Sequence, residues 1–265
     1  MIYITGDCHG DFKKLTKKQR NKLPFTMSEE DSLIICGDFG LLWEKGKCYD
    51  YNRNWLSSLP FRILWVQGNH ENYNMIAEYP LEEWNGGRVR YIVRDKIILL
   101  ERGQVFQIEG KSFFTMGGAS SHDIQGGILD RNASNYEALK TMSKKKKLPY
   151  RIVNESWWEQ ELPDEEELQE SDRNLSKNGY KVDYVISHCA ANRIQNFLEQ
   201  KDRQQGKEYG GYSPDILTNY FEKLEDKLQY QHWFFGHYHD NMEIDEKHTL
   251  LYEEIVSVNS LNCSI

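Results

Sequence analysis

The chain has 265 residues, which is enough to bury one large core or two small ones. Hydrophobic residues make up 39%, charged residues 28% and aromatic residues 13%, so the composition is that of a globular protein and excludes a disordered chain. The formal net charge is −8, which disfavours a protein whose main task is to grip the backbone of a nucleic acid duplex. A nucleic acid partner that binds in a local basic groove stays open as an alternative.

The cysteines and the lengths of the apolar runs indicate the cellular compartment in which the protein is expected. Five cysteines lie at scattered positions without a C-x-x-C pair, which favours a reducing compartment over a disulfide framework. The first residues have neither the basic nor the apolar region of a signal peptide. No run of about 18 apolar residues predicts a transmembrane helix. We therefore expect a cytoplasmic protein without a membrane partner, and its oligomeric state is left open.

Short apolar runs that end in polar or glycine residues recur along the chain. Runs of this kind, rich in β-branched and aromatic residues, are typical of buried strands. They cover Met1–Thr5, Ser32–Cys36, Arg62–Gln67, Val182–Ser187 and Trp233–Phe235. Helices are predicted over Asp11–Lys22 and Tyr49–Ser58. Strands that alternate with helices in this way predict an α/β sheet whose faces are covered.

The other segments complete this prediction. Val89–Leu100 and Gln104–Met116 are each predicted to form a pair of antiparallel strands, which build a second sheet or extend the first. The segment around 136–178 is predicted to be a charged, helical insertion, and Leu250–Val258 to be a closing strand. We see no internal repeat and no clear domain boundary, so we expect a single domain over residues 1–265.

Each of the five apolar runs is followed directly by side chains that can bind metal ions. They are Asp7, His9, Asp38, Asn69, His188, His237 and His239. Loops after the strand ends of an α/β sheet meet at one edge, so we expect these groups to converge. Carboxylate, amide oxygen and imidazole together suit Mn²⁺, Fe²⁺ or Zn²⁺. Seven ligands exceed the needs of one tetrahedral ion and suit two ions that share a bridging carboxylate.

Single elements of this pattern are weak indicators. Asp7 with His9 is a common pair, and Asp38 after a glycine is typical of an ordinary turn. The strongest single element is Gly-His-x-His at 236–239, because the spacing of His237 and His239 can place two imidazoles on one site. The joint occurrence of all five elements favours a metal centre. Two ions about 3.5–4 Å apart can clamp a phosphoryl group and generate a hydroxide nucleophile at neutral pH.

The order of these elements resembles the calcineurin-like metallophosphoesterase superfamily over most of the chain. The resemblance implies a four-layer αββα sandwich, with two mixed sheets flanked by helices and a dinuclear metal site at the C-terminal ends of the strands. It implies that one ion is held by Asp7, His9 and His239, the other by Asn69, His188 and His237, and that Asp38 bridges them. Mn²⁺ is the expected metal, with Fe and Zn²⁺ as alternatives.

His70 is expected to act outside the set of metal ligands. The resemblance implies that it protonates the leaving-group oxygen or stabilises charge on the phosphoryl oxygens. Neighbouring side chains on extended backbone diverge, so Asn69 can face a metal while His70 faces the substrate. We also predict that both Asn69 and His70 contact the substrate, and that His70 is the catalytic residue.

The sequence departs from the serine/threonine protein phosphatases of this superfamily after Asp38. Those enzymes carry Gly-Asp-x-x-Asp-Arg-Gly, whereas this chain has Gly-Asp-Phe-Gly-Leu-Leu-Trp at 37–43. Both the carboxylate partner of His70 and a phosphate-clamping arginine are thus missing from their usual positions. Arg131 and Arg193 are candidates for the clamp, with a plain surface position as an equal alternative. His122 is a candidate for an additional ligand, but a single histidine in a loop is more often not one.

These observations predict a metal-dependent phosphoester hydrolase that acts on a small phosphomonoester or a nucleotide-like phosphodiester. Two alternatives remain, which are a serine/threonine protein phosphatase and a metal-binding scaffold of the same fold with weak catalysis. A scaffold would be free to lose Asp38 or His70, and the chain retains both.

Overall fold

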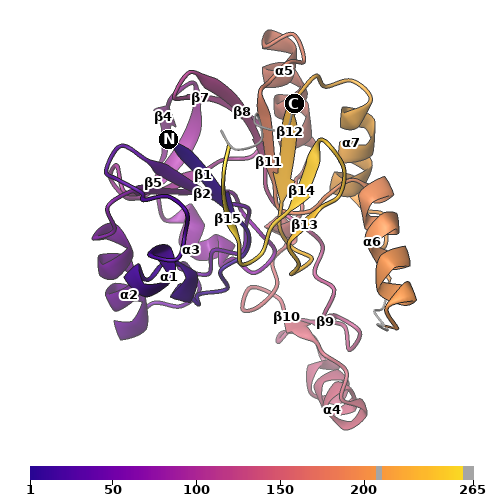
Figure 1. Cartoon of the computed structure of the whole chain (residues 1–265). Helices are drawn as coiled ribbons and strands as arrows, with labels where there is room; N and C mark the ends of the chain where they lie inside the picture. The colour runs from indigo at the N-terminus through magenta and orange to yellow at the C-terminus, as the bar shows by residue number, and fades with distance from the viewer. Residues whose placement is uncertain (207–210, 259–265) are drawn as a thin grey trace.

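The computed structural model describes residues 1–206 and 211–258, and in these ranges the chain forms a four-layer αββα sandwich (Figure 1). Two mixed sheets lie face to face and helices cover their outer faces, as predicted. Within the same ranges, no helix is both long enough and apolar enough to cross a membrane.

The first sheet has the strand order β15-β1-β2-β3-β6-β5-β4. Its strands are β1 (Ile2–Thr5), β2 (Ser32–Ile35), β3 (Arg62–Trp65), β4 (Leu81–Trp84), β5 (Gly87–Val93), β6 (Ile97–Leu100) and β15 (Ile255–Ser257). Strands β1, β2, β3 and β6 run parallel, whereas β15, β5 and β4 pair antiparallel. The strand pair predicted over Val89–Leu100 is confirmed as β5 and β6, which extend this sheet.

The second sheet has the order β13-β14-β12-β11-β8-β7. Its strands are β7 (Gln104–Ile108), β8 (Lys111–Met116), β11 (Tyr184–Ser187), β12 (His232–Phe235), β13 (Met242–Glu243) and β14 (His248–Leu250). The antiparallel pair predicted over Gln104–Met116 is confirmed as β7 and β8. The single closing strand predicted over Leu250–Val258 is wrong. The chain ends β14, which lies between β13 and β12 of the second sheet, and then enters the first sheet as its edge strand β15.

The outer face of the first sheet is covered by η1 (Lys13–Leu15), α1 (Lys17–Arg20), α2 (Lys47–Ser57) and α3 (Tyr73–Ala77). The helix predicted over Tyr49–Ser58 is confirmed as α2. The long helix predicted over Asp11–Lys22 is wrong, because Thr16 has an extended backbone with ψ 151° and separates η1 from α1. The buried Lys14 also directs its ammonium group to the carbonyl oxygens of Gly6 and Asp7, away from solvent.

The outer face of the second sheet is covered by α5 (Glu165–Lys177), α6 (Asn192–Gln204) and α7 (Ile216–Glu225). Two of these helices begin with a capping box, in which Asp164 of α5 and Asp215 of α7 accept hydrogen bonds from free backbone N–H groups of the first turn. The caps fix where these helices start relative to the sheet edge.

A third apolar layer fills the space between the two sheets. It includes Ile4, Ile34, Leu64, Phe113, Ile186 and Phe234. Alternate residues of the same strands, such as Tyr3 and Leu33, face the helices instead. The central strands are therefore buried on both faces, which explains why they read as continuous apolar runs.

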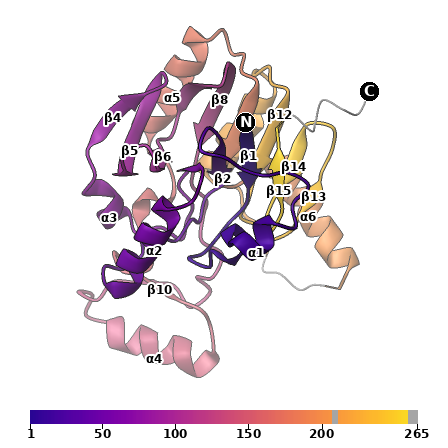
Figure 2. The ribbon, with the colours of Figure 1, turned by 60° about the vertical axis from the view of Figure 1, so that its left-hand side comes forward.

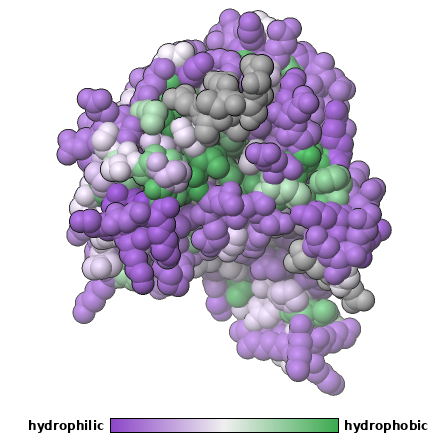
Figure 3. Space-filling model, viewed as in Figure 1, coloured by the Kyte–Doolittle hydropathy of each residue, from purple (hydrophilic) through white to green (hydrophobic). Residues whose placement is uncertain are grey.

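The insertion around 136–178 is only partly helical. Helix α4 (Tyr136–Lys146) projects from the sandwich on two connections that include the short parallel strands β9 (Ile128–Leu129) and β10 (Arg151–Ile152) (Figures 1 and 2). The projecting part has a mostly hydrophilic surface (Figure 3). After β10 the chain returns through the 3-10 turn η2 (Glu159–Glu161) to α5. The return brings buried side chains of this segment to the edge where the predicted site lies.

Candidate metal centre

The side chains that follow β1, β2, β11 and β12 gather at one edge of the sandwich. Among the described residues, three groups place one ligand atom from each member within 4.8 Å of the others. The groups are Asp7, His9 and His239; Asp7, Asp38 and His188; and His9, Asp38 and His70. The shared membership of Asp7 and Asp38 makes one continuous cluster, which is compatible with a dinuclear site.

The first group is compact. Oδ2 of Asp7 lies 3.3 Å from Nε2 of His239 and 3.5 Å from Nε2 of His9. The two imidazole nitrogens are 2.8 Å apart. Three donor atoms that face a common point at such distances form one side of a coordination shell for a divalent ion.

The second group is organised around His188, which is buried after β11. Its Nδ1 donates to the carbonyl oxygen of Cys36 at 2.7 Å, so Nε2 is the nitrogen that would bind a metal ion in place of a proton. This Nε2 lies 3.2 Å from Oδ1 of Asn69 and 3.4 Å from Oδ2 of Asp38. The same Asp38 oxygen is 3.7 Å from Nδ1 of His9, so Asp38 lies between the two groups.

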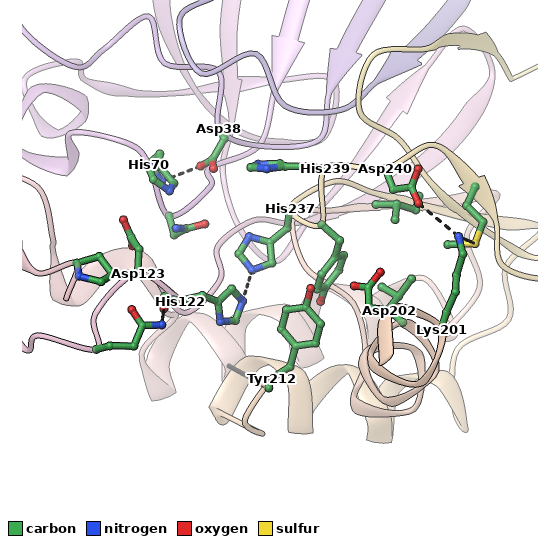
Figure 4. A pocket seen from close by; sticks show the side chains of 18 residues that line it. Asp38, His70, His122, Asp123, Lys201, Asp202, Tyr212, His237, His239 and Asp240 are labelled. Atoms are coloured by element: carbon green, nitrogen blue, oxygen red, sulfur yellow. Dashed lines mark hydrogen bonds and ion pairs between the residues drawn. The ribbon is translucent and has the colours of Figure 1, made fainter. Parts of the chain in front are cut away.

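His237 is beside this cluster but turns toward a residue whose role the sequence left open. Its ring centroid is 4.9 Å from that of His188, and its backbone N–H donates to Asp7. Its Nε2, however, lies 2.7 Å from Nε2 of His122 (Figure 4). The structure therefore brings six of the seven predicted ligands into direct contact and places His237 beside them, with its ring turned toward His122.

Several candidate ligands have unusual backbone conformations. The φ angles of His9, Asp38, His237 and His239 are 48°, 47°, 72° and 50°. Residues other than glycine rarely adopt this left-handed region, at a cost of about 1–3 kcal/mol each. Such strain persists where the surrounding structure enforces it, and it clusters at functional sites.

Two glycines allow the strand ends to approach this closely. A Cβ atom on Gly68 would lie 2.0 Å from Oδ1 of Asp38, and one on Gly236 would lie 2.1 Å from Oδ1 of Asp7. Any larger side chain at either position would displace a carboxylate. The glycines that precede Asn69 and His237 in the sequence motifs are thus required by packing.

The cluster holds buried charges of both signs. Asp7 and Asp38 are both buried, and although burial alone would raise the pKa of each carboxyl, His188 and the hydrogen bonds around them hold both values well below the usual range. The same two carboxylates raise the pKa of His188 to about 9 against the effect of its burial. Buried carboxylates of this kind are paired or coordinate metals. Oxygen and imidazole donors together fit divalent ions such as Mn²⁺, Fe²⁺ or Zn²⁺.

His70 is held by an arginine that the sequence motifs did not reveal. The backbone N–H of His70 donates to Oδ1 of Asp38 at 2.7 Å. Nη2 of Arg151 lies 2.8 Å from Nε2 and 3.1 Å from Nδ1 of its imidazole. Because this cationic donor contacts both ring nitrogens, it disfavours coordination of an ion by His70. Burial, with help from Arg151, lowers the pKa of His70 to about 4.

Arg151 is itself fixed in place. Its side chain is 5% exposed and pairs with Asp123, with Nε to Oδ1 at 2.6 Å and Nη2 to Oδ2 at 3.0 Å. The two arginines that the sequence suggested are directed elsewhere, since Arg131 pairs with Glu155 and Arg193 with Glu222 at exposed positions. A buried arginine in an insertion carries no motif, so only the fold identifies it.

A second contact from the insertion orients Asn69. Its Nδ2 donates to Oγ of Ser121 at 3.3 Å, and that hydroxyl donates to Oε2 of Glu161 at 2.6 Å. The chain of hydrogen bonds keeps the amide nitrogen away from the cluster and leaves Oδ1 toward it. Glu161 lies in η2, and burial raises its pKa to about 8. The insertion thus supports two residues of the candidate centre.

Three hollows border the cluster: one of about 670 Å³ is lined by Asp7 and His9, and the other two are both lined by His70. The larger of the two at His70 has a volume of about 540 Å³ and extends from Asp38 and His70 past His122 to Tyr212 and Lys201 (Figure 4). The smaller, of about 250 Å³, is lined by His9, Gly40, Trp43 and His70. The cluster is therefore accessible to a small molecule, in a cavity of a size typical for such ligands.

Two facing mixed sheets with a buried Asp/His cluster at one edge define a protein with a candidate dinuclear metal centre. The chain belongs to the calcineurin-like phosphoesterase family, whose model matches residues 1–241. This membership implies metal-dependent phosphoester hydrolysis. A comparison with curated proteins gave no significant match. Among solved structures, the phosphopantetheinyl hydrolase of Mycobacterium tuberculosis is similar at 14% identity and a TM-score of 0.44, over 95% of this chain and 89% of that one.

Proposed function

We propose that this chain hydrolyses a small phosphoester, either a phosphomonoester or a nucleotide-like phosphodiester, with two divalent metal ions, of which Mn²⁺ is the expected one. The observation that carries the proposal is the position of Asp38, whose carboxylate lies 3.4 Å from His188 and 3.7 Å from His9. A buried carboxylate shared by two groups of imidazole and oxygen donors suits two ions better than one.

The residues divide between the two ions as follows. Asp7, His9 and His239 would hold one ion, Asn69, His188 and His237 the other, and Asp38 would contact both. When bound, such ions supply positive charge to the phosphoryl oxygens and lower the pKa of water to near neutrality. The buried carboxylates and the strained backbone keep the donor atoms in place before substrate arrives, so little reorganisation is needed.

His70 would act on the substrate rather than on a metal. An arginine can only donate hydrogen bonds, so the neutral imidazole of His70 accepts from Arg151 at one ring nitrogen and carries its proton on the other. A neutral imidazole with a fixed N–H suits hydrogen bonding to a phosphoryl or leaving-group oxygen. Arg151 positions this group from behind, and the paired Asp123 balances its charge.

The test is to replace the shared carboxylate. We expect Asp38→Asn to lose metal, measured by elemental analysis, and to lose turnover of p-nitrophenyl phosphate and its bis-ester in the presence of Mn²⁺. Asp172→Asn, at a half-exposed position on α5, is the matched control and should behave as wild type. A fully active Asp38→Asn protein would contradict the assignment. A wild-type protein that binds metal and hydrolyses none of these esters would instead be a metal-binding scaffold.

A further inference from the structure

Two of the hollows beside the metal cluster meet at one side chain. His70 lines the larger cavity together with Asp38 and Asn69, and it also lines the smaller hollow together with His9. A phosphorus atom bound at the cluster next to His70 would therefore have open space on two sides. A phosphomonoester has one organic group to place, whereas a phosphodiester has two.

The larger cavity is built to accept an organic group rather than only phosphate. Its walls include Leu198, Tyr212, Tyr238 and Met242 beyond the histidines. The ring of Tyr212 is held edge-on against His122, with centroids 4.9 Å apart, and against Tyr238, with centroids 5.1 Å apart. Aromatic and aliphatic walls of this kind favour burial of an apolar or planar substituent.

The smaller hollow presents a separate aromatic surface, the side chain of Trp43. This tryptophan follows the Asp38 loop and is 36% exposed. Its ring packs edge-on against the buried Trp158, with centroids 5.9 Å apart, and its carbonyl oxygen accepts a hydrogen bond from Asn72. Trp43 is therefore fixed in orientation, but part of its ring remains free to stack on a ligand next to His70.

Apart from the metal ions, the described side chains around the larger cavity supply no surplus of positive charge, which favours a substrate with a single negative charge. Lys201 lies on its wall and pairs with Asp240 at 3.3 Å, and Arg151 behind His70 pairs with Asp123. Asp202 also lines the cavity. The positive charges of these side chains are thus already balanced by carboxylates. A phosphodiester carries one negative charge at neutral pH, whereas a phosphomonoester carries close to two.

From the two hollows and their charges we infer that the substrate is a phosphodiester with organic groups on both sides, one of which carries a planar ring that stacks on Trp43. This inference rests on the proposed function and narrows it. In the reaction, water adds its oxygen to phosphorus and the bond from phosphorus to one ester oxygen breaks. The released proton passes to the departing oxygen, and the products are an alcohol and a phosphomonoester.

The first experiment compares kcat/KM for p-nitrophenyl phosphate, its bis-ester and the p-nitrophenyl ester of thymidine 5′-phosphate with Mn²⁺ present. We expect both diesters to be preferred by about tenfold or more, with the thymidine ester the better of the two, since stacking of a base on an aromatic ring contributes about 1–3 kcal/mol. Trp43→Ala should lower kcat/KM for the thymidine ester by about tenfold and that for the monoester by less than about twofold. Trp43→Phe should retain most of the preference, and Tyr51→Ala, an exposed aromatic on α2, is the control.

The second experiment measures binding without turnover. Titration calorimetry with a thymidine dinucleoside phosphorothioate should give an affinity about tenfold weaker for Trp43→Ala than for wild type and Tyr51→Ala. Equal use of mono- and diesters, together with unchanged binding by Trp43→Ala, would overturn the inference and leave the proposed function intact. Absence of hydrolysis of every ester by the metal-loaded wild type would overturn the proposed function itself. Thermal unfolding of each variant separates loss of binding from loss of folding.

Discussion

Nη2 of Arg151 lies 2.8 Å from Nε2 of His70, although the two residues are 81 positions apart in the chain. The contact links the motif that follows β3 to the insertion that carries α4. The chain lacks the aspartate that the protein phosphatase motif carries four residues after Gly37 and the arginine that follows it, and Arg151 contacts the imidazole of His70 instead. The insertion therefore contacts the residue that we propose to be catalytic, and this contact can be tested.

Arg151→Gln should reduce turnover by about 10- to 100-fold while metal content stays at the wild-type level, because a support of the imidazole is lost and the ligands are not. The charge of Arg151 lowers the pKa of His70. Its removal should therefore move the limb of the pH–rate profile that reports the protonation of His70 to higher pH. Arg131→Gln, at an exposed position, is the control. An unchanged pH profile in Arg151→Gln would show that the arginine has only a structural role.

Ser121→Ala should weaken metal binding, because the hydroxyl fixes the amide of Asn69 and connects it to Glu161. Loss of an outer hydrogen bond of this kind typically costs about 10- to 100-fold in metal affinity. Titration of metal-free protein with Mn²⁺ measures the effect. The neighbouring Ser120→Ala is the matched control, since its hydroxyl bonds to Asp215 instead. Equal affinities for the two variants would argue against this orienting role.

Gly68→Ala should abolish metal binding and turnover, since the new methyl group would lie 2.0 Å from Oδ1 of Asp38. The comparison is with Gly110→Ala, where a Cβ atom meets nothing within 4 Å but the backbone has a φ of 74°. That control should lose only about 1–2 kcal/mol of stability and keep its metal. Normal metal content in Gly68→Ala would mean that Asp38 can move without consequence.

The stability of the metal-free protein should fall as pH rises from about 5 to about 8, in part through Glu161. Burial raises the pKa of this carboxyl to about 8 in the folded state, whereas the unfolded chain has the ordinary value of 4.5. Between the two values the unfolded state loses the proton and the folded state keeps it, so unfolding becomes easier. Glu161→Gln should flatten this slope in urea unfolding at several pH values. The exposed Glu159→Gln should retain it, and parallel slopes for both variants would exclude Glu161 as the cause.

Removal of metal should lower the melting temperature. Ions that bind only the folded state stabilise it by about 2.7 kcal/mol at a free concentration of 100 times Kd. They would also relieve the repulsion between the buried Asp7 and Asp38. Calorimetric scans before and after chelation, and again after Mn²⁺ is restored, measure the change. The Asp38→Asn variant should show little response to added Mn²⁺, and a full response would place the stabilising ion elsewhere.

The sequence predicted much of the fold because strands that are buried on both faces appear in it as continuous apolar runs. Strands buried on both faces, such as β1 and β2, are continuous apolar runs with little ambiguity. The prediction was wrong where a local pattern competed with tertiary contacts. Lys14 lies in a segment with helical spacing, yet its ammonium group is drawn to buried carbonyl oxygens, and the helix breaks at Thr16.

The ligand types, their order and the class of chemistry were determined by the sequence alone, because the metal-binding residues follow strand ends and parallel strands carry their ends to one edge. Only the tertiary structure decided what surrounds them. Arg151, Glu161 and Trp43 belong to no sequence motif. Arg151 and Glu161 come to the cluster from the insertion, and Trp43 comes from the loop that follows Asp38. Such contacts depend on distances between segments remote in the chain, and local residue patterns contain no information about those distances.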